Sequence, residues 1–338
     1  MSVRRLFGLA LATVLAVSLA ACSSSDDQSG SAGGGAGFPV TVQHVYGSTT
    51  IESKPERVAT VAWANHEVPL ALGVVPVGMS KAAWGDDNGN GVLPWVEDEL
   101  SDLGASTPEL FDETDGIDYE AVADSAPDVI LAAYSGLSKD EYDKLSKIAP
   151  VVAYPTTPWG TSWEDMVRRN SQAIGLQADG EKLVGTLTGQ VNEALDRHAE
   201  LKGRKVMFAY LDPTDLSKIG FYTSHDTRQG FLESVGLKAP QEVAAKSAGS
   251  DEFYVEESAE EAERFKDVDL IVTYGDDSTI ARLKADPLLS KIPAVAAGHV
   301  AVLKDGTPLA AMANPSPLSI PWGIDDYFGT LAAGLTDK

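Results

Sequence analysis

The stretch GDDNGNGVLPWVED places oxygen-bearing side chains at the spacing of a twelve-residue calcium loop. Asp86, Asn88, Asn90 and Glu97 stand at the first, third, fifth and twelfth positions, and Gly91 stands at the sixth. Carboxylate and amide oxygens, with a glycine that permits a sharp turn, suit a hard cation. The same composition also makes ordinary Asp/Asn/Gly turns that hold no ion. The loop is therefore expected to be either a structural calcium site or a turn of that kind.

The single cysteine of the chain follows an apolar run that begins behind two arginines. That run is shorter than the roughly 20 apolar residues of a membrane-spanning helix and is typical of a secretion signal. The residues LAAC at 19–22 resemble the bacterial lipobox, in which the cysteine becomes the first residue and its sulfur carries a lipid. We expect residues 1–21 to be removed, Cys22 to anchor the chain to the outer face of the bacterial plasma membrane, and residues 22–37 to form a flexible tether.

Charge and cysteine content narrow the partners and the means of stabilisation. The chain of 338 residues has 50 acidic and 26 basic residues, a formal charge of −24, which disfavours nucleic acid and anionic lipid surfaces as partners. No second cysteine exists, so no disulfide within the chain stabilises the fold, and stability must come from apolar burial. Nothing in the pattern indicates self-association, and we expect a monomer.

Short apolar runs bounded by Gly, Pro and Asp alternate with helical patterns from about residue 57 onward. Such runs are typical of strands buried on both faces of a parallel sheet, and they indicate an α/β fold. The runs are RVATVAW (57–63), VVPVGM (74–79), PDVILAAY (127–134), PVVAYP (150–155), RKVMFAYL (204–211), DLIVTYG (269–275) and HVAVLK (299–304).

The two halves of the chain repeat one order of parts. In residues 117–134 and again in 254–275, a carboxylate opens a helix and an Asp begins a buried strand that ends in tyrosine. A Leu-Ser-Lys-Ile segment and a further Pro-bounded strand are expected after each. We predict two similar α/β lobes with mainly parallel sheets, residues 38–178 and 202–338, joined by a single long amphipathic helix at 179–201. Strand ends that face each other would form a ligand cleft.

Several segments of the sequence, taken together in their order, resemble a known family. Residues 47–78, GSTTIESKPERVATVAWANHEVPLALGVVPVG, are similar to the opening of the ferric-siderophore and cobalamin substrate-binding proteins of ABC importers. The similarity continues through Pro127-Asp128-Val129-Ile130 to Lys291-Ile292-Pro293-Ala294-Val295. The resemblance implies two lobes joined by one rigid helix, with little hinge closure around an iron(III) chelate. It also implies one exposed carboxylate on each lobe that pairs with permease arginines.

Those docking carboxylates can be placed by their distance from the repeated Asp. Glu120 lies eight residues before Asp128, and Glu261 lies eight residues before Asp269, with Glu260 as the alternative if the second helix carries one extra residue. A solvated helix start would have the same composition, so for the second lobe both interpretations stay open.

The expected ligand is a ferric siderophore of the hydroxamate or mixed-ligand type, held by aromatic faces and a few hydrogen-bond donors. No other cofactor is required, and iron enters only as the chelate. Arg228 begins a predicted helix, where its planar fork of donors suits a negative chelate oxygen. About half of the aromatic side chains are expected to touch the ligand, and the others to pack in the core. The candidate residues are Trp63, His66, Trp84, Tyr134, Trp159, Tyr222, Arg228, Tyr274 and Trp322.

Other classes remain as alternatives. Cobalamin, haem or a bare metal ion could be the ligand, although the five histidines are scattered and form no short metal motif. A surface sensor or adhesin lipoprotein would share the anchor without needing a cleft. A hydrolase would need a nucleophile and a base in reach. Since the sequence holds no G-x-S-x-G elbow, G-x-G-x-x-G fingerprint or Walker loop, we do not expect an enzyme.

Overall fold

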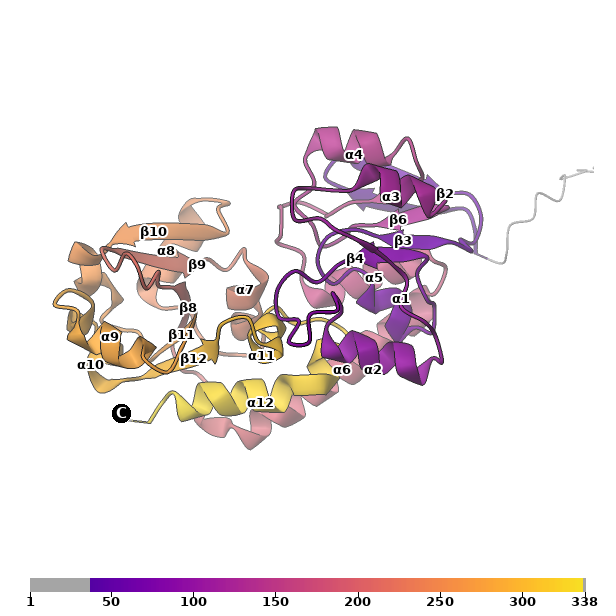
Figure 1. Ribbon diagram of the computed structural model, residues 1–338. Helices are drawn as coiled ribbons and strands as arrows, with labels where there is room; N and C mark the ends of the chain where they lie inside the picture. The colour runs from indigo at the N-terminus through magenta and orange to yellow at the C-terminus, as the bar shows by residue number, and fades with distance from the viewer. Residues whose placement is uncertain (1–36, 337–338) are drawn as a thin grey trace, which may run out of the picture. The chain divides into compact units, whose positions relative to one another are not determined.

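The computed structural model describes residues 37–336, so the expected signal segment, Cys22 and all but the end of the expected tether lie outside the described residues. The described chain forms two α/β lobes, each built on one five-stranded sheet. The long helix α6 (Gln177–Arg197) lies between them in the sequence. Figure 1 shows the first lobe in indigo to magenta and the second in colours that run through orange to yellow. The predicted α/β class with two similar lobes and one long connecting helix is confirmed.

The first lobe carries a two-stranded hairpin, a five-stranded sheet and five helices. The hairpin is β1 (Val40–His44) and β2 (Gly47–Ile51). In spatial order the sheet is β5 (Glu109–Phe111), β4 (Gly78–Ser80), β3 (Val58–Thr60), β6 (Val129–Leu131) and β7 (Val151–Val152), and all neighbours are parallel. The helices are α1 (Glu67–Ala71), α2 (Pro94–Asp102), α3 (Tyr119–Asp124), α4 (Lys139–Leu145) and α5 (Trp163–Ala173).

The second lobe follows a short 3-10 helix, η1 (Ala199–Leu201). Its sheet is, in spatial order, β10 (Tyr254–Ser258), β9 (Lys218–Tyr222), β8 (Val206–Tyr210), β11 (Leu270–Gly275) and β12 (Val300–Lys304). Its helices are α7 (Thr227–Ser234), α8 (Gln241–Gly249), η2 (Ala259–Phe265), α9 (Thr279–Ala285), η3 (Leu289–Lys291), α10 (Pro293–Ala297), α11 (Pro308–Met312) and α12 (Ser319–Ala333). None of the helices within 37–336 is both long and apolar enough to cross a membrane.

Both sheets have the same strand order. Counted along the chain within each five-stranded sheet, the order is third, second, first, fourth, fifth. The β8–β9 and β9–β10 pairs are antiparallel, so the second sheet is only mainly parallel. The repeated Asp also has the same role in both lobes, because Asp128 accepts from the backbone N–H of Arg57 at 3.0 Å and Asp269 from that of Lys205 at 2.8 Å. The repeat read from the sequence is therefore a repeat of structure.

Two details of the predicted repeat are wrong in the second lobe. The segment after Leu-Ser-Lys-Ile is not a strand but helix α10, because Pro293 stands at the first helical position, where a missing N–H costs nothing, and Gly298 ends the helix with a φ of 82°. The strand comes later, at β12. The helix expected around Glu261 is the 3-10 helix η2, in which Glu261 itself has non-helical dihedral angles.

Apolar residues form one core shared by the lobes and two smaller cores that belong to one lobe each. The shared core takes residues from both sheets and from α5, α6, α7, α11 and α12. The central strands feed both kinds of core by alternation: in β11, Leu270 and Val272 join the shared core, while Ile271 joins the second-lobe core. Helix α12 packs along α6, as Figure 1 shows. The lobes are thus joined by packing as well as by sequence.

A buried carboxylate adds a polar connection to the shared core. Glu67, at the start of α1, accepts from Trp95 Nε1 at 2.8 Å and from the backbone N–H of Leu318, just before α12, at 3.0 Å. Burial raises the pKa of Glu67 to about 7, although these hydrogen bonds favour the carboxylate. The first lobe is therefore bonded to the C-terminal segment through a group that titrates near neutrality.

Stability should depend on pH through Glu67. Because its folded-state pKa is raised from 4.5, its contribution is fully present below pH 4.5 and is lost as the pH rises through about 7. Glu67→Gln cannot titrate, so its unfolding free energy should fall less than that of the unaltered protein between pH 5 and pH 8, by about 2–3 kcal/mol. Urea unfolding of both proteins at the two pH values measures this difference. Equal pH dependence in both proteins would contradict it.

Candidate ligand-binding site

The site lies where each sheet reverses its strand order. In both lobes the reversal falls between the first and fourth strands, which are β3 and β6 in one lobe and β8 and β11 in the other. Loops that leave the carboxyl ends of such strands diverge and open a crevice. Trp63 follows β3, Tyr134 follows β6, and Tyr274 is near the end of β11. The fold thus brings the strand-end aromatics of the two lobes toward one place.

These aromatics line a hollow of ≈ 310 Å³. Its wall is mainly aromatic, with one cationic side chain and one amide. The lining residues are Trp63, Trp84, Tyr134, Trp159, Arg228, Phe253, Tyr274, Ala311 and Asn314. Two edge-to-face pairs stiffen the wall: Tyr134 with Trp159, at 5.4 Å between ring centres, and Trp84 with Tyr274, at 5.2 Å. Ligand pockets typically combine such apolar faces with a few polar groups.

Hydrogen bonds cross between the lobes at the floor and rim of this hollow. Tyr134 Oη lies 3.0 Å from Thr227 Oγ1 and accepts from Asn314 Nδ2 at 2.8 Å. Burial raises the pKa of Tyr134 to about 12, so the phenol keeps its proton at neutral pH. At the rim, Trp84 Nε1 donates to Asp305 at 3.2 Å. The aromatic wall is therefore held in place before any ligand arrives.

The loop that presents Trp63 has an unusual backbone. Ala62 and Ala64 both have φ of 61°, a left-handed conformation that non-glycine residues rarely adopt. The carboxylate of Glu113 accepts from the backbone N–H of Ala62, and the buried Asn65 amide donates to the carbonyl oxygens of Trp63 and Tyr134. Strained residues that are fixed by neighbours are typical of ligand-binding sites.

Trp159 depends on a glycine beside it. Its own φ is 57°, and its backbone N–H donates to the carbonyl of Ser135. A Cβ on Gly136 would lie 2.3 Å from Trp159 Nε1, so only glycine leaves room for the indole. The positions of Trp63 and Trp159 thus depend on two loops with left-handed backbone residues, and in the case of Trp159 also on Gly136.

Six of the nine predicted ligand-binding residues line the hollow, and three do not. Tyr222 lies behind it, with its ring 3.7 Å from the Arg228 guanidinium. His66 is buried at the start of α1, where burial lowers its pKa to about 4. Trp322 lies on α12, packs on Trp95 at 5.1 Å between ring centres, and lines a different hollow beside α6. Helix α12 turns Trp322 toward α2, which the sequence pattern did not indicate.

Sequence reasoning missed three lining residues. Phe253, Ala311 and Asn314 come from loops or helix ends of the second lobe, and no strand-end rule selects them. Asn314 stands in Ala-Asn-Pro-Ser-Pro, a turn composition whose function the sequence alone does not indicate. Phe253 is 39% exposed, and its ring forms part of the apolar wall.

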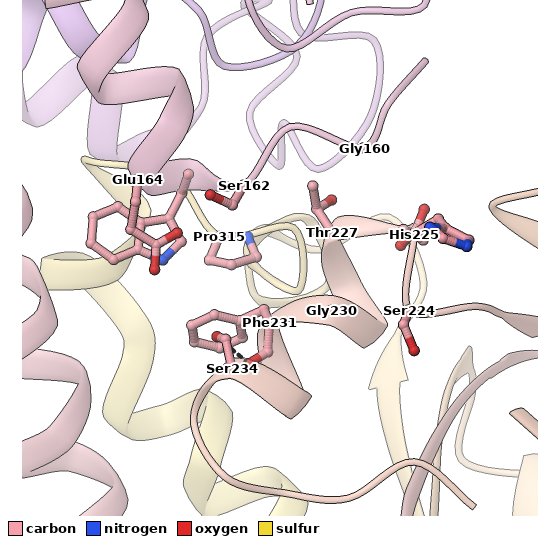
Figure 2. A pocket seen from close by; sticks show the side chains of 12 residues that line it. Gly160, Ser162, Glu164, Ser224, His225, Thr227, Gly230, Phe231, Ser234 and Pro315 are labelled. Carbon is pink, nitrogen blue, oxygen red and sulfur yellow. Dashed lines mark hydrogen bonds between the residues drawn. The ribbon is translucent and has the colours of Figure 1, made fainter. Parts of the chain in front are cut away.

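A second hollow, of ≈ 210 Å³, lies between the start of α5 and α7 (Figure 2). Ser162 caps the start of α5 and Glu164 lies in its first turn, Thr227 and Phe231 come from α7, and Pro315 comes from the loop before α12. Thr227 belongs to both regions, since its hydroxyl also meets Tyr134 of the aromatic hollow. The second hollow has few aromatic faces and no lysine or arginine in its lining, so the aromatic hollow is the stronger candidate for an organic chelate.

The four side chains of the proposed calcium loop do come together. Asp86 accepts from the backbone N–H groups of Asn88, Gly89 and Gly91, and Glu97 accepts from the amide nitrogens of Asn88 and Asn90. An ion would need the amide oxygens of these asparagines in place of their nitrogens. Across residues 37–336, no three His, Cys, Asp or Glu side chains gather as metal ligands. The calcium site stays a prediction, and the turn interpretation stays beside it.

Thermal unfolding separates the two interpretations of this loop. If it binds calcium, millimolar calcium should raise the melting temperature by several degrees relative to chelator, because the ion binds only the folded state. The double variant Asp86→Ala with Glu97→Ala should then show no calcium response. Identical curves for the unaltered protein in calcium and in chelator would leave the loop as a turn.

All three candidate docking carboxylates are exposed. Glu120 lies in the first turn of α3, and Glu260 and Glu261 lie in η2. Glu261 pairs with Arg264 at 2.8 Å, on the surface. Each lobe thus presents a carboxylate at the corresponding position before its repeated Asp.

Two similar lobes whose strand ends share one aromatic hollow form the architecture of a solute-binding protein. Residues 58–307 match the periplasmic binding protein family, and the chain belongs to that family. The match confirms the resemblance seen in the sequence.

The relatives include siderophore-binding proteins. The chain is 46% identical to PiaA of Streptococcus pneumoniae, whose crystal structure in complex with ferrichrome matches with a TM-score of 0.84 over 88% of this chain and 98% of that chain. It is 27% identical over 256 residues to the probable siderophore-binding lipoprotein YfiY of Bacillus subtilis. That alignment covers 75% of this chain and 74% of YfiY. It is 25% identical over 284 residues to the Fe(3+) dicitrate-binding periplasmic protein FecB of Escherichia coli. That alignment covers 80% of this chain and 84% of FecB.

Proposed function

We propose that this chain is the substrate-binding protein of an ABC importer and that it captures an iron(III)-siderophore in the aromatic hollow. The observation that carries the proposal is that six of the residues selected as ligand contacts from sequence line one hollow at the switch points of both sheets. The 46% identity to PiaA, which was crystallised with ferrichrome and is described as the substrate-binding protein of an iron uptake ABC transporter, supports it.

The ligand we propose is a ferric hydroxamate or mixed-ligand siderophore. The organic shell of such a chelate offers apolar surface to the tryptophan and tyrosine rings, while its iron-bound oxygens accept hydrogen bonds. Arg228 and the Asn314 amide provide N–H groups in the lining, and Tyr134 provides a phenol. Iron enters as cargo within the chelate. The protein then acts by binding and delivery and not as an enzyme.

A titration panel tests the ligand class. Tryptophan fluorescence of the domain from residue 38 onward should be quenched in a saturable way by ferrichrome, because Trp63, Trp84 and Trp159 line the hollow. Cobalamin, haem, zinc and manganese salts serve as the competing ligands. Tight binding of cobalamin or haem without any siderophore response would contradict the proposal. A surface sensor or adhesin without a ligand would give no saturable change in tryptophan fluorescence with any ligand of the panel.

We further propose that a lipid on Cys22 anchors the mature chain to the outer face of the bacterial plasma membrane and that the chain works as a monomer. The LAAC motif and the polar tether behind it support the anchor, and the name of YfiY as a lipoprotein agrees with it. Metabolic labelling with a fatty acid, compared between the unaltered chain and Cys22→Ser, tests the anchor. Light scattering of the domain from residue 38 tests the monomer.

Glu120 and Glu261, with Glu260 as the alternative to Glu261, are proposed to dock on permease arginines. Their exposure and their equivalent places in the two lobes support this role. Two carboxylates on separate lobes would engage the permease on both lobes at once. An exposed ion pair contributes little by itself, so docking would require both.

A further inference from the structure

Arg228 is the one charged side chain among the nine residues that line the aromatic hollow, and its charge is balanced inside the protein. Its Nε donates to Asp226 Oδ1 at 2.8 Å, and its Nη2 donates to Asp226 Oδ2 at 2.7 Å. The Asp226 side chain is 0% exposed, whereas 20% of the Arg228 side chain is exposed. The carboxylate is therefore enclosed behind the guanidinium, which faces the hollow.

The pair is fixed by its local structure. Asp226 caps α7, because Oδ1 also accepts from the backbone N–H of Arg228 at 2.9 Å. The guanidinium lies over the ring of Tyr222, with 3.7 Å from its central carbon to the ring centre. Burial alone would lower the pKa of Arg228, but the hydrogen bonds and charge of Asp226 outweigh it and raise the pKa, so the arginine stays charged. Both charges are present, and they cancel.

We propose that Asp226 is a specificity-determining residue: by neutralising Arg228 it makes the hollow select iron chelates without net charge over anionic chelates. This inference rests on the proposed function. A guanidinium bound to two carboxylate oxygens still has N–H groups for a ligand oxygen, so it can orient a chelate without attracting it by charge.

An Arg228 without the Asp226 carboxylate would favour anionic chelates, which is why Asp226 matters for selectivity. An anionic chelate that enters the hollow loses its hydration, and only an unbalanced cation would compensate that loss. The remaining lining residues are uncharged, and the formal charge of −24 on the chain opposes anions at longer range. A hydroxamate chelate such as ferrichrome meets no such penalty, because its hydroxamates balance the charge of iron(III).

Asp226→Asn tests the inference. Asparagine keeps an oxygen for the α7 cap but removes the negative charge, which leaves Arg228 unbalanced at the wall. Affinities for ferrichrome and for anionic ferric dicitrate are measured by fluorescence titration in the unaltered domain and in the variant. The ratio of the two affinities should shift at least tenfold toward ferric dicitrate, and the gain should shrink as salt is added. An unchanged ratio in a folded variant would overturn the inference.

Two control variants separate the effect of the Asp226–Arg228 pair from the effect of removing any negative charge. Asp251→Asn removes an exposed carboxylate two residues before Phe253 and should leave the ratio unchanged. Adding Arg228→Gln to Asp226→Asn removes the unbalanced cation and should abolish the gain for ferric dicitrate. A gain of the same size in Asp251→Asn, or a gain that survives the double variant, would contradict the role of Asp226.

If Asp226→Asn does not fold, the dependence of ferric dicitrate affinity on ionic strength in the unaltered domain tests the role of Asp226 without any mutation. In the unaltered domain, a balanced Arg228 gives anions no attraction, so affinity for ferric dicitrate should not fall as ionic strength rises. A clear fall would show that the charge of Arg228 acts on the ligand, and would overturn the inference while leaving the proposed function intact. If the unaltered domain binds neither chelate, the proposed function itself fails, and this inference fails with it.

Discussion

Replacing Trp159 by alanine should weaken ferrichrome binding roughly 10- to 100-fold. Truncating a central aromatic anchor in a binding site typically costs about 1–3 kcal/mol, and Trp159 supplies one face of the hollow and braces Tyr134 edge to face. The fold should tolerate the change, because the indole is only partly buried and lies on a surface loop. Isothermal titration of the two proteins with ferrichrome measures the loss.

Trp322→Ala is the matched control for this experiment. Both residues are partly exposed tryptophans that the sequence pattern favoured as ligand contacts, but Trp322 packs on Trp95 beside α12 and lies outside the aromatic hollow. Its replacement should leave ferrichrome affinity within about twofold of the unaltered value. Equal losses in the two variants, or no loss in Trp159→Ala, would mean that the ligand binds elsewhere.

Charge reversal of both docking glutamates should reduce iron uptake at least tenfold while chelate affinity stays the same. In Glu120→Lys with Glu261→Lys, each lobe would present a lysine to permease arginines, and like charges at an interface cost several kcal/mol. Both side chains are exposed, and neither lines the hollow. Uptake of radioactive ferrichrome by cells that carry the variant, together with titration of the purified domain, gives the two measurements.

Glu200→Lys provides the same charge change at an exposed glutamate after α6 and should leave uptake unchanged. The single variants and Glu260→Lys identify which residue of the second lobe is used. Normal uptake by the double variant would exclude a docking role for these carboxylates, and a fall in chelate affinity would point to a wider structural effect.

Much of the fold could be predicted because buried parallel strands have a simple pattern. All seven apolar runs chosen from the sequence overlap a strand, and the repeated Asp immediately precedes β6 and β11 in the same way. The antiparallel strands β9 and β10 were missed, since β9 is interrupted by Gly220. A Cβ at that position would lie 2.7 Å from the backbone carbonyl oxygen of Tyr210 on the neighbouring strand β8, so the glycine that interrupts the apolar pattern leaves room for the pairing.

The site was predictable to the extent that it follows strand ends. Trp63, Tyr134 and Tyr274 were selected by that rule, and all three line the hollow. Phe253 and Asn314 come from loops whose paths depend on tertiary packing, so no local pattern reveals them. Trp322 lies outside the hollow, and its position was not predictable, because the neighbours of a residue in the first turn of a helix are known only when the buried face of the helix is known.

The shared apolar core has a consequence for how a cell would use this protein. Swinging the lobes far apart would pull apart side chains that pack continuously from the first sheet through α6 and α12 to the second. The empty and the loaded forms therefore present closely similar faces to a permease. Empty copies then compete with loaded copies for the same docking sites, so copies made beyond the supply of chelate would slow import instead of speeding it.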